Sequence, residues 1–278
     1  MNTSAVIKIL RPINLAITFF SVVIAAVISS SFTNLDIYVY VMALSVTFSF
    51  AAGNVINDVI DFEIDKINRP ERVLPQGLIS ISSAKGMYVF SVLCSLILAA
   101  IISIEVLVIL IGLNLLLLLY STNLKKTILL SNFVVAFATA FPLVLGGIVV
   151  NNFMGGLIPA GFAFFTNFIR EIIKDIEDIK GDSSEGVKTF PQKVGIDKSI
   201  YFVFILIVLL IILDTFPFLF DIYNAEYFVI IMVVVNPIFV YIIKLLNREK
   251  DLKTFRKSSG LIKLSMIIGL VAILIGAQ

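Results

Sequence analysis

Residues 106–119 read VLVILIGLNLLLLL, a stretch that contains no charged side chain and a single amide, Asn114. A helix needs about 20 apolar residues to cross the hydrocarbon core of a bilayer. Together with the residues up to Thr122, this stretch is long enough to cross. It therefore predicts a transmembrane helix over 106–122.

Apolar stretches of similar length recur along the whole chain. They cover 13–33, 37–57, 86–104, 106–122, 131–150, 156–173, 199–217, 226–244 and 260–277. The 278 residues are 59% hydrophobic and only 14% charged, whereas about 25% is usual for a soluble domain. We therefore predict an all-α, polytopic membrane protein with nine transmembrane helices. This composition excludes a soluble nucleic-acid-binding or partner-binding module.

Two residue types that often carry chemistry are scarce. The chain has no histidine, and its one cysteine, Cys94, lies inside an apolar stretch. Acid–base catalysis by histidine, Ser-His-Asp triads and His or Cys metal sites are therefore excluded, as are disulfide bonds.

The basic residues predict the orientation of the chain. If the N-terminus is inside, all 21 Lys and Arg residues lie on or near the inner side, where cytoplasmic loops collect them. We expect a multi-pass protein of the cell membrane, with the N-terminus and the long loops cytoplasmic and the C-terminus outside. The long loops are expected at 58–85, 123–130, 174–198 and 245–259.

A short acidic pattern occurs twice. Residues 57–65 read NDVIDFEID and residues 175–182 read DIEDIKGD, each with Asp at i, i+3 and i+7 and each followed by Pro-Gln. Four predicted spans separate the copies, so both face the same side of the membrane. This predicts a parallel duplication within a single domain over 1–278, arranged around a central cavity. Repeat one covers about 10–122, repeat two about 131–244, and the extra helix about 260–277.

The two acidic segments predict a magnesium site. Carboxylates that converge near a membrane interface repel one another, and burying unpaired charge is costly. Oxygen ligands without His or Cys suit Mg²⁺, which uses one or two carboxylates together with phosphate oxygens. We therefore expect a phosphate-bearing substrate here. The candidate ligands are Asn57, Asp58, Asp61, Asp65, Asp175, Asp178 and Asp182, and the candidate catalytic residues are Asp61, Asp65, Asp178 and Asp182.

Basic and polar residues beside the acids are candidates for binding the substrate. Arg and Lys bind phosphate oxygens and stabilise a leaving diphosphate, although cytoplasmic loops carry them for topology as well. Tyr120 could be an interface anchor or could stabilise a cation through its ring. The basic residues between the last two spans are interpreted as contacts with anionic membrane lipids. The candidates are Arg11, Asn14, Arg69, Arg72, Tyr120, Lys125, Arg170, Lys174 and Lys188.

The motifs resemble those of the UbiA-type intramembrane prenyltransferases. The first acidic motif is followed by Asn-Arg-Pro-x-Arg at 68–72, and the second lies within 170–182. Arg-Pro-x-Asn at 11–14 and Tyr-Ser-x-x-Leu-Lys at 120–125 are also similar to this family. The resemblance covers about 10–275 and includes the nine-helix count.

This resemblance implies a reaction. Mg²⁺ held by both acidic segments would bridge the diphosphate of an isoprenyl donor. Arg69, Arg72, Lys125 and Lys188 would neutralise the leaving group while an acceptor captures the allylic cation. The prenyl chain would lie in an apolar tunnel between the helices.

The second motif is most similar to that of the archaeal digeranylgeranylglyceryl phosphate synthases. This implies geranylgeranyl diphosphate as the donor and geranylgeranylglyceryl phosphate, a lipid-like phosphate, as the acceptor. The product would carry the second ether bond of archaeal lipids. An aromatic acceptor such as 4-hydroxybenzoate stays open. A membrane transporter is the alternative of another class, but its sites usually lie near the bilayer midplane. No nucleic acid and no protein partner are expected.

Overall fold

A computed structural model describes residues 3–32, 35–183 and 189–278, with side chains throughout except at 67, 68, 126 and 180–183. Nine helical stretches of the described chain are long and apolar enough to cross a membrane, which confirms the predicted fold class. These stretches are α2 (Pro12–Ser29), α3 (Ile37–Ile60), α5 (Ile81–Ile102), α6 (Ile104–Thr122), α7 (Leu130–Val149), α8 (Phe153–Ser183), α10 (Ile196–Leu213) with α11 (Phe216–Leu219), the three consecutive helices α12 (Ala225–Ile230), η2 (Ile231–Val235) and α13 (Asn236–Arg248), and α14 (Leu252–Gly276).

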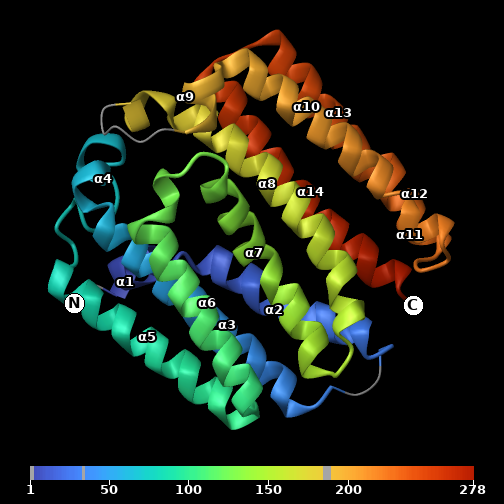
Figure 1. The fold of residues 1–278 in the computed structure, drawn as a ribbon, viewed down its shortest axis with the longest axis horizontal. Helices are drawn as coiled ribbons and strands as arrows, with labels where there is room; N and C mark the ends of the chain where they lie inside the picture. The colour runs from blue at the N-terminus through green and yellow to red at the C-terminus, as the bar shows by residue number, and fades with distance from the viewer. Residues whose placement is uncertain (1–2, 33–34, 184–188) are drawn as a thin grey trace.

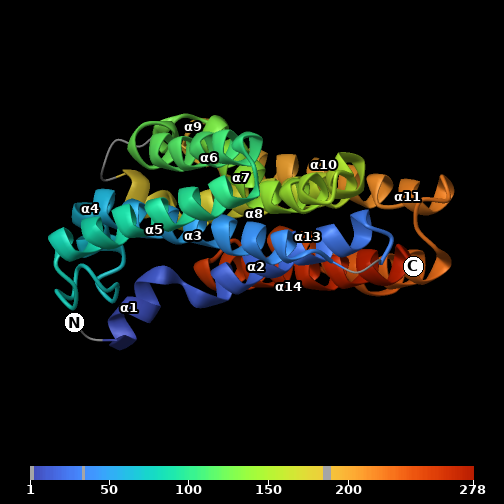
Figure 2. The same cartoon turned by 90° about the horizontal axis from the view of Figure 1, so that it is seen from below.

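Four short helices in the described part of the chain lie outside the spans. They are α1 (Thr3–Leu10), α4 (Phe62–Asn68), α9 (Phe190–Val194) and the single turn η1 (Leu124–Lys126). In both ribbon views, α1 and α4 lie at the end that carries the N-terminus, and α11 and the C-terminus lie at the opposite end (Figures 1 and 2). This separation of the termini is what an odd number of spans requires.

Two helices are longer than the sequence predicted. The second acidic segment was expected to begin a loop at 174, but α8 continues to Ser183. The loop expected at 245–259 is also shorter, because α14 begins at Leu252, where the Asp251 side chain accepts a hydrogen bond of 2.8 Å from the Thr254 amide. Hydropathy identifies only the part of a helix that lipid surrounds, so the polar ends of both helices were missed.

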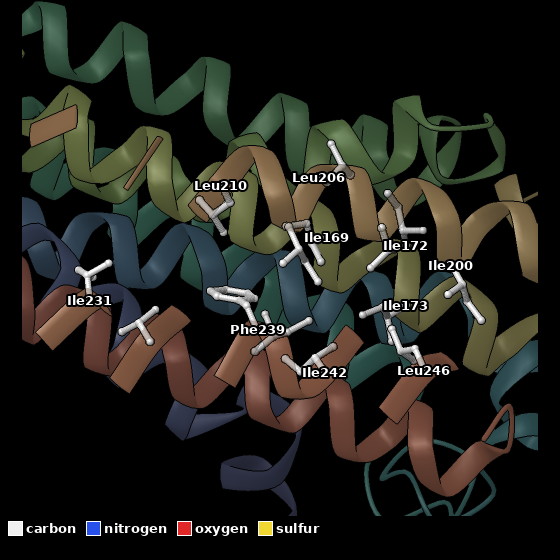
Figure 3. Packing of buried hydrophobic residues seen from close by; sticks show 14 of the residues in the cluster. Ile169, Ile172, Ile173, Ile200, Leu206, Leu210, Ile231, Phe239, Ile242 and Leu246 are labelled. Atoms are coloured by element: carbon white, nitrogen blue, oxygen red, sulfur yellow. The ribbon is translucent and has the colours of Figure 1, made fainter. Parts of the chain in front are cut away.

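The largest buried cluster joins α8 to the last three spans. Ile169, Ile172 and Ile173 of α8 lie against residues of α10 and α13 (Figure 3). α14, the predicted extra helix, packs against α8, α12 and α13. α8 is thereby held on its apolar side while its other side faces the cavity described below. The division into two four-helix repeats stays a prediction from the sequence.

Glycines bring α2, α7 and α8 into close contact. A Cβ atom on Gly146 would overlap the carbonyl oxygen of Val22, and one on Gly155 would overlap Ser29. Small residues allow such close approach between helices in membranes. Near the acidic end, the chain turns sharply at Arg11, whose φ is 57°, and α2 then begins with Pro12.

The eighth span contains a wide turn. Residues Ile231–Val235 form the π-helical turn η2 between α12 and α13. Ile231 and Val235 are both buried, and both line the cavity that contains the candidate site. π turns inside α-helices occur often at functional sites.

Candidate active site

A cavity of about 990 Å³ lies among α2, α3, α6, α7, α8, α14 and the eighth span. Most of its wall is apolar, with contributions from Phe20, Val135, Phe162 and Leu270. Its polar wall contains 13 of the predicted site residues. These are Arg11, Asn14, Asn57, Asp61, Asp65, Arg69, Arg72, Tyr120, Lys125, Arg170, Lys174, Asp175 and Asp178.

The first acidic segment passes through a break between α3 and α4. The helix is interrupted at Asp61, yet the Asp61 amide still donates to the Asn57 carbonyl at 2.9 Å. The Asp65 amide donates to the Asp61 carbonyl at 2.7 Å. Because the chain stays close to helical through the break, these three side chains keep the spacing of one helix face and all line the cavity.

Each cavity-lining carboxylate of this segment has a basic partner. Asp61 is paired with Lys125. It also accepts a hydrogen bond of 3.0 Å from the side-chain amide of Asn57. Asp65 is paired with Arg72 at 2.5 Å. Burial raises the pKa of the Asp65 carboxyl above its usual value, although the charge of Arg72 acts in the opposite direction. The basic residues therefore balance a set of buried acids.

Asp58 has a different place from the one predicted. It was expected to be a metal ligand, but it is absent from the cavity wall. Its carboxylate is paired with Arg11 and also contacts Arg72, with an Nη1–Oδ1 distance of 3.3 Å. Residue 58 follows Asn57 by one position, so its side chain leaves the helix in a different direction. Asp58 joins the start of α2 to the loop that follows α4.

The second acidic segment lies on the continuous helix α8. Asp178 is paired with Arg69 at 3.0 Å, a contact between residues that are 109 positions apart in the sequence. Asp175 accepts a hydrogen bond of 2.8 Å from the side chain of Asn132 on α7. The two acidic segments therefore meet at one cavity. Two predicted residues, Asp182 and Lys188, have side chains outside the described part of the chain.

Several polar residues of the cavity wall were not among the predicted site residues. Asn132 lies near the start of α7 and Glu171 lies on α8, and both line the cavity. Lys263 lies inside α14, within the span predicted at 260–277, and it also lines the cavity. Asp214, which caps the end of α10, is buried and also lines the cavity. An isolated polar residue carries no spacing signal that marks it as functional.

The site suits a metal ion that is shared with a substrate. Among the side chains that the structure describes, no three carboxylates are grouped closely enough to hold a metal by themselves. Mg²⁺ commonly takes one or two carboxylates, and substrate phosphates complete its shell. Carboxylate and amide oxygens on two facing segments, with Arg and Lys among them, match this requirement.

The family model of the UbiA prenyltransferase family matches residues 15–267. The chain belongs to this family, as its motifs predicted. Among its relatives, the digeranylgeranylglyceryl phosphate synthase of Methanocaldococcus jannaschii is 37% identical over 92% of this chain and 89% of the relative. The enzyme of the same name from Methanosphaera stadtmanae is 34% identical over 98% of each chain.

Solved structures show the same fold. A digeranylgeranylglyceryl phosphate synthase structure is 34% identical, covers 99% of this chain and 98% of its own, and superimposes with a TM-score of 0.80. A UbiA homologue from Archaeoglobus fulgidus, solved with geranyl diphosphate (GPP) and Mg²⁺, is 20% identical with a TM-score of 0.69, covering 97% and 99%. These likenesses agree with the predicted multi-pass membrane architecture.

Proposed function

We propose that this protein transfers a geranylgeranyl group from geranylgeranyl diphosphate to geranylgeranylglyceryl phosphate in a Mg²⁺-dependent reaction. The observation that carries the proposal is the meeting of two acidic segments at the polar wall of a largely apolar cavity. A polar wall of this kind suits a diphosphate, and the apolar remainder suits a prenyl chain. Relatives at 34–37% identity that bear the name digeranylgeranylglyceryl phosphate synthase support this choice of acceptor.

The residues that would hold Mg²⁺ come from both segments. Asn57, Asp61 and Asp65 would contribute from the first segment, and Asp175, Asp178 and Asp182 from the second. Bound Mg²⁺ supplies positive charge that stabilises diphosphate as a leaving group.

Basic residues would bind the departing diphosphate. Lys125, Arg72 and Arg69 are each paired with a carboxylate that lines the cavity. Phosphate oxygens can take the place of those carboxylates, because Arg and Lys bind both anions in the same way. Asp58 would act as a positioning residue, since it holds the guanidinium groups of Arg11 and Arg72 together.

The cavity would direct the allylic cation to the acceptor once the prenyl diphosphate has ionised. The bond between the allylic carbon and diphosphate breaks, the electron pair leaves with diphosphate, and a bond forms between that carbon and the acceptor hydroxyl oxygen. The hydroxyl proton is then released. The apolar wall excludes water from the cation, and the ring of Tyr120, which lines the cavity, can stabilise positive charge.

We also propose the orientation of the chain from its charge distribution. The N-terminus and the acidic segments would lie on the cytoplasmic side and the C-terminus outside, because basic residues accumulate in cytoplasmic loops. Both substrates would then enter from the cytoplasmic half of the membrane.

The test is a product assay with protein purified in detergent. Geranylgeranyl diphosphate is supplied with geranylgeranylglyceryl phosphate, or separately with 4-hydroxybenzoate, in Mg²⁺ or in EDTA. A diether that forms only with Mg²⁺ is the expected result. A prenylated benzoate without the diether would replace the acceptor but keep the chemistry. Failure of both acceptors, with the fold intact by circular dichroism, would overturn the proposal and favour transport.

A further inference from the structure

A second basic group lines the cavity and is separate from the pairs around the first acidic segment. Arg170 and Lys174 of α8 flank Glu171, and we call these three residues together with Lys263 of α14 the basic wall. Arg170 contacts Glu171 at 2.9 Å and Lys174 contacts it at 3.0 Å. Lys263 donates to the Asn14 side chain at 3.1 Å. Arg170, Glu171, Lys174 and Lys263 all line the cavity.

The basic wall has more positive than negative charge. It contains three basic residues and one carboxylate, so these four residues carry a net charge of +2. The Glu171 carboxylate is largely buried and is engaged by two of the bases. Lys263 meets a neutral amide and is repelled by the nearby charge of Arg170. In addition, the buried Nε of Arg170 has no hydrogen-bond partner among the described residues.

An excess of positive charge inside membrane-spanning helices costs free energy, because the surrounding lipid does not solvate it. Basic residues in spans face cavities and mark the paths of substrates or ions. Lys263 lies near the middle of α14, away from the loop where topology would explain a lysine. The basic wall therefore favours the binding of an anion in the cavity beyond Glu171.

This anion site is distinct from the proposed diphosphate site. Arg170, Lys174 and Asp178 follow one another at intervals of four residues on α8, so they form one stripe along the cavity wall. With a rise of about 1.5 Å per residue, Arg170 lies about 12 Å along the helix from Asp178. The bases proposed to bind diphosphate are instead paired with Asp61, Asp65 and Asp178.

We propose that Arg170, Lys174 and Lys263 bind the phosphate monoester of the acceptor, an inference that rests on the proposed function. A phosphate monoester carries a charge of about −1.5 to −2 at neutral pH, which matches the excess charge of the basic wall. In geranylgeranylglyceryl phosphate, the free hydroxyl lies on the carbon next to the one that bears the phosphate. A phosphate on the basic wall therefore directs this hydroxyl toward the acidic segments, where the allylic carbon would lie.

The experiment measures equilibrium binding in EDTA, where turnover is not expected. Geranylgeranylglyceryl phosphate is titrated into the wild type, Lys263→Gln and Arg170→Gln, and geranylgeranylglycerol serves as the ligand without phosphate. We expect each substitution to weaken binding of the phosphate lipid by about tenfold or more, as loss of a charged hydrogen bond does. Binding of geranylgeranylglycerol should change little.

Two further variants control for charge and folding. Lys263→Arg keeps the charge and should retain most of the affinity. Lys253→Gln removes a base from an exposed position of the same helix, so it should bind the lipid as the wild type does. Geranylgeranyl diphosphate binding in Mg²⁺ reports whether each variant is folded, and it should stay within about twofold of the wild type, a difference below 1 kcal/mol.

The titration tests the anion site and the product assay tests the proposed function, so a failure of one proposal can be told from a failure of the other. If Lys263→Gln and Arg170→Gln bind the phosphate lipid as tightly as the wild type, the inference is overturned even when the diether forms. Equal weakening for the lipids with and without phosphate would overturn it too. If the diether does not form but the phosphate-specific loss is seen, the proposed function fails and the anion site stands.

Discussion

The two acidic segments share a sequence spacing but differ in their surroundings. In the first, Asp58, Asp61 and Asp65 are each paired with Arg or Lys, and the Asp58 side chain is only 7% exposed. In the second, the Asp178 side chain is 40% exposed, and Asp175 accepts from the neutral amide of Asn132. Equal spacing therefore places the acids at one cavity, but the neighbouring helices decide whether an acid is structural or accessible.

The backbone differs as well. The first segment crosses the break at Asp61 between α3 and α4, whereas the second stays on the unbroken α8. That helix is fixed by the buried side chains of Ile169, Ile172 and Ile173 (Figure 3). We infer that the first segment is held by its ion pairs and the second by the apolar packing of its helix. Four predictions test this difference.

The largest effect is expected from the acids of both segments that line the cavity. Asp61→Asn, Asp65→Asn and Asp178→Asn should each lower kcat by about a hundredfold or more, because the metal loses a charged ligand next to the leaving group. Initial rates of diether formation at saturating Mg²⁺ measure this. Near-normal turnover in Asp178→Asn would show that the second segment does not take part in metal binding.

Asp58→Asn should affect stability more than any of those variants. It leaves two guanidinium groups without their shared carboxylate, and removing one partner of a buried pair costs about 3 kcal/mol or more. Thermal unfolding in detergent should show a lower Tm than for the wild type. Asp178→Asn is the matched comparison, since its exposed pair contributes little. Equal Tm values for the two variants would contradict the difference drawn between the segments.

Arg69→Gln removes the contact that joins the segments. Its pair with Asp178 is more than a third exposed on both sides, so Tm should stay near that of the wild type. We expect kcat/KM for the donor to fall by about tenfold, the size of one charged hydrogen bond to diphosphate. A large loss of Tm with unchanged kcat/KM would instead assign Arg69 a structural role.

The smallest effect is expected from Asn132→Ala. This change removes the 2.8 Å hydrogen bond to Asp175 but leaves the carboxylate within the cavity wall. A single hydrogen bond of this kind contributes about 1 kcal/mol, so turnover should fall about fivefold. Asn132→Asp is the sharper companion, because a second acid beside Asp175 adds negative charge and should lower the Mg²⁺ concentration needed for half-maximal rate. An unchanged requirement would place Asp175 outside the metal site.

The sequence predicted the parts of the molecule that depend on periodic patterns. Nine apolar stretches gave nine spans, and the doubled Asp spacing placed Asp61 and Asp178 at the same cavity. These features follow from helix geometry and hydropathy, which act locally. The predicted ligand Asp58 illustrates the limit, because only the packing of α2 against α3 brings Arg11 to its carboxylate.

Residues that depend on distant contacts escaped prediction. Lys263 lies within the span predicted at 260–277, but the sequence does not show that it lines the cavity or contacts the Asn14 side chain. Arg170 and Lys174 are near enough in sequence to pair with Glu171, but the sequence does not show that this group lines a cavity. Their placement results from the packing of α14 on α8, which a single sequence does not reveal.

The π turn in the eighth span has a consequence for the shape of the cavity. In a plain α-helix, residues four positions apart drift by about 40° around the axis, so residues 227 and 239 would diverge by about 120°. Yet Tyr227, Ile231, Val235 and Phe239 all line the cavity. The wider turn at 231–235 rotates the chain less per residue and so reduces this angular drift. The same helix face therefore points to the cavity along the whole span. Within this span, an extra residue in one turn gives the prenyl chain a straight wall.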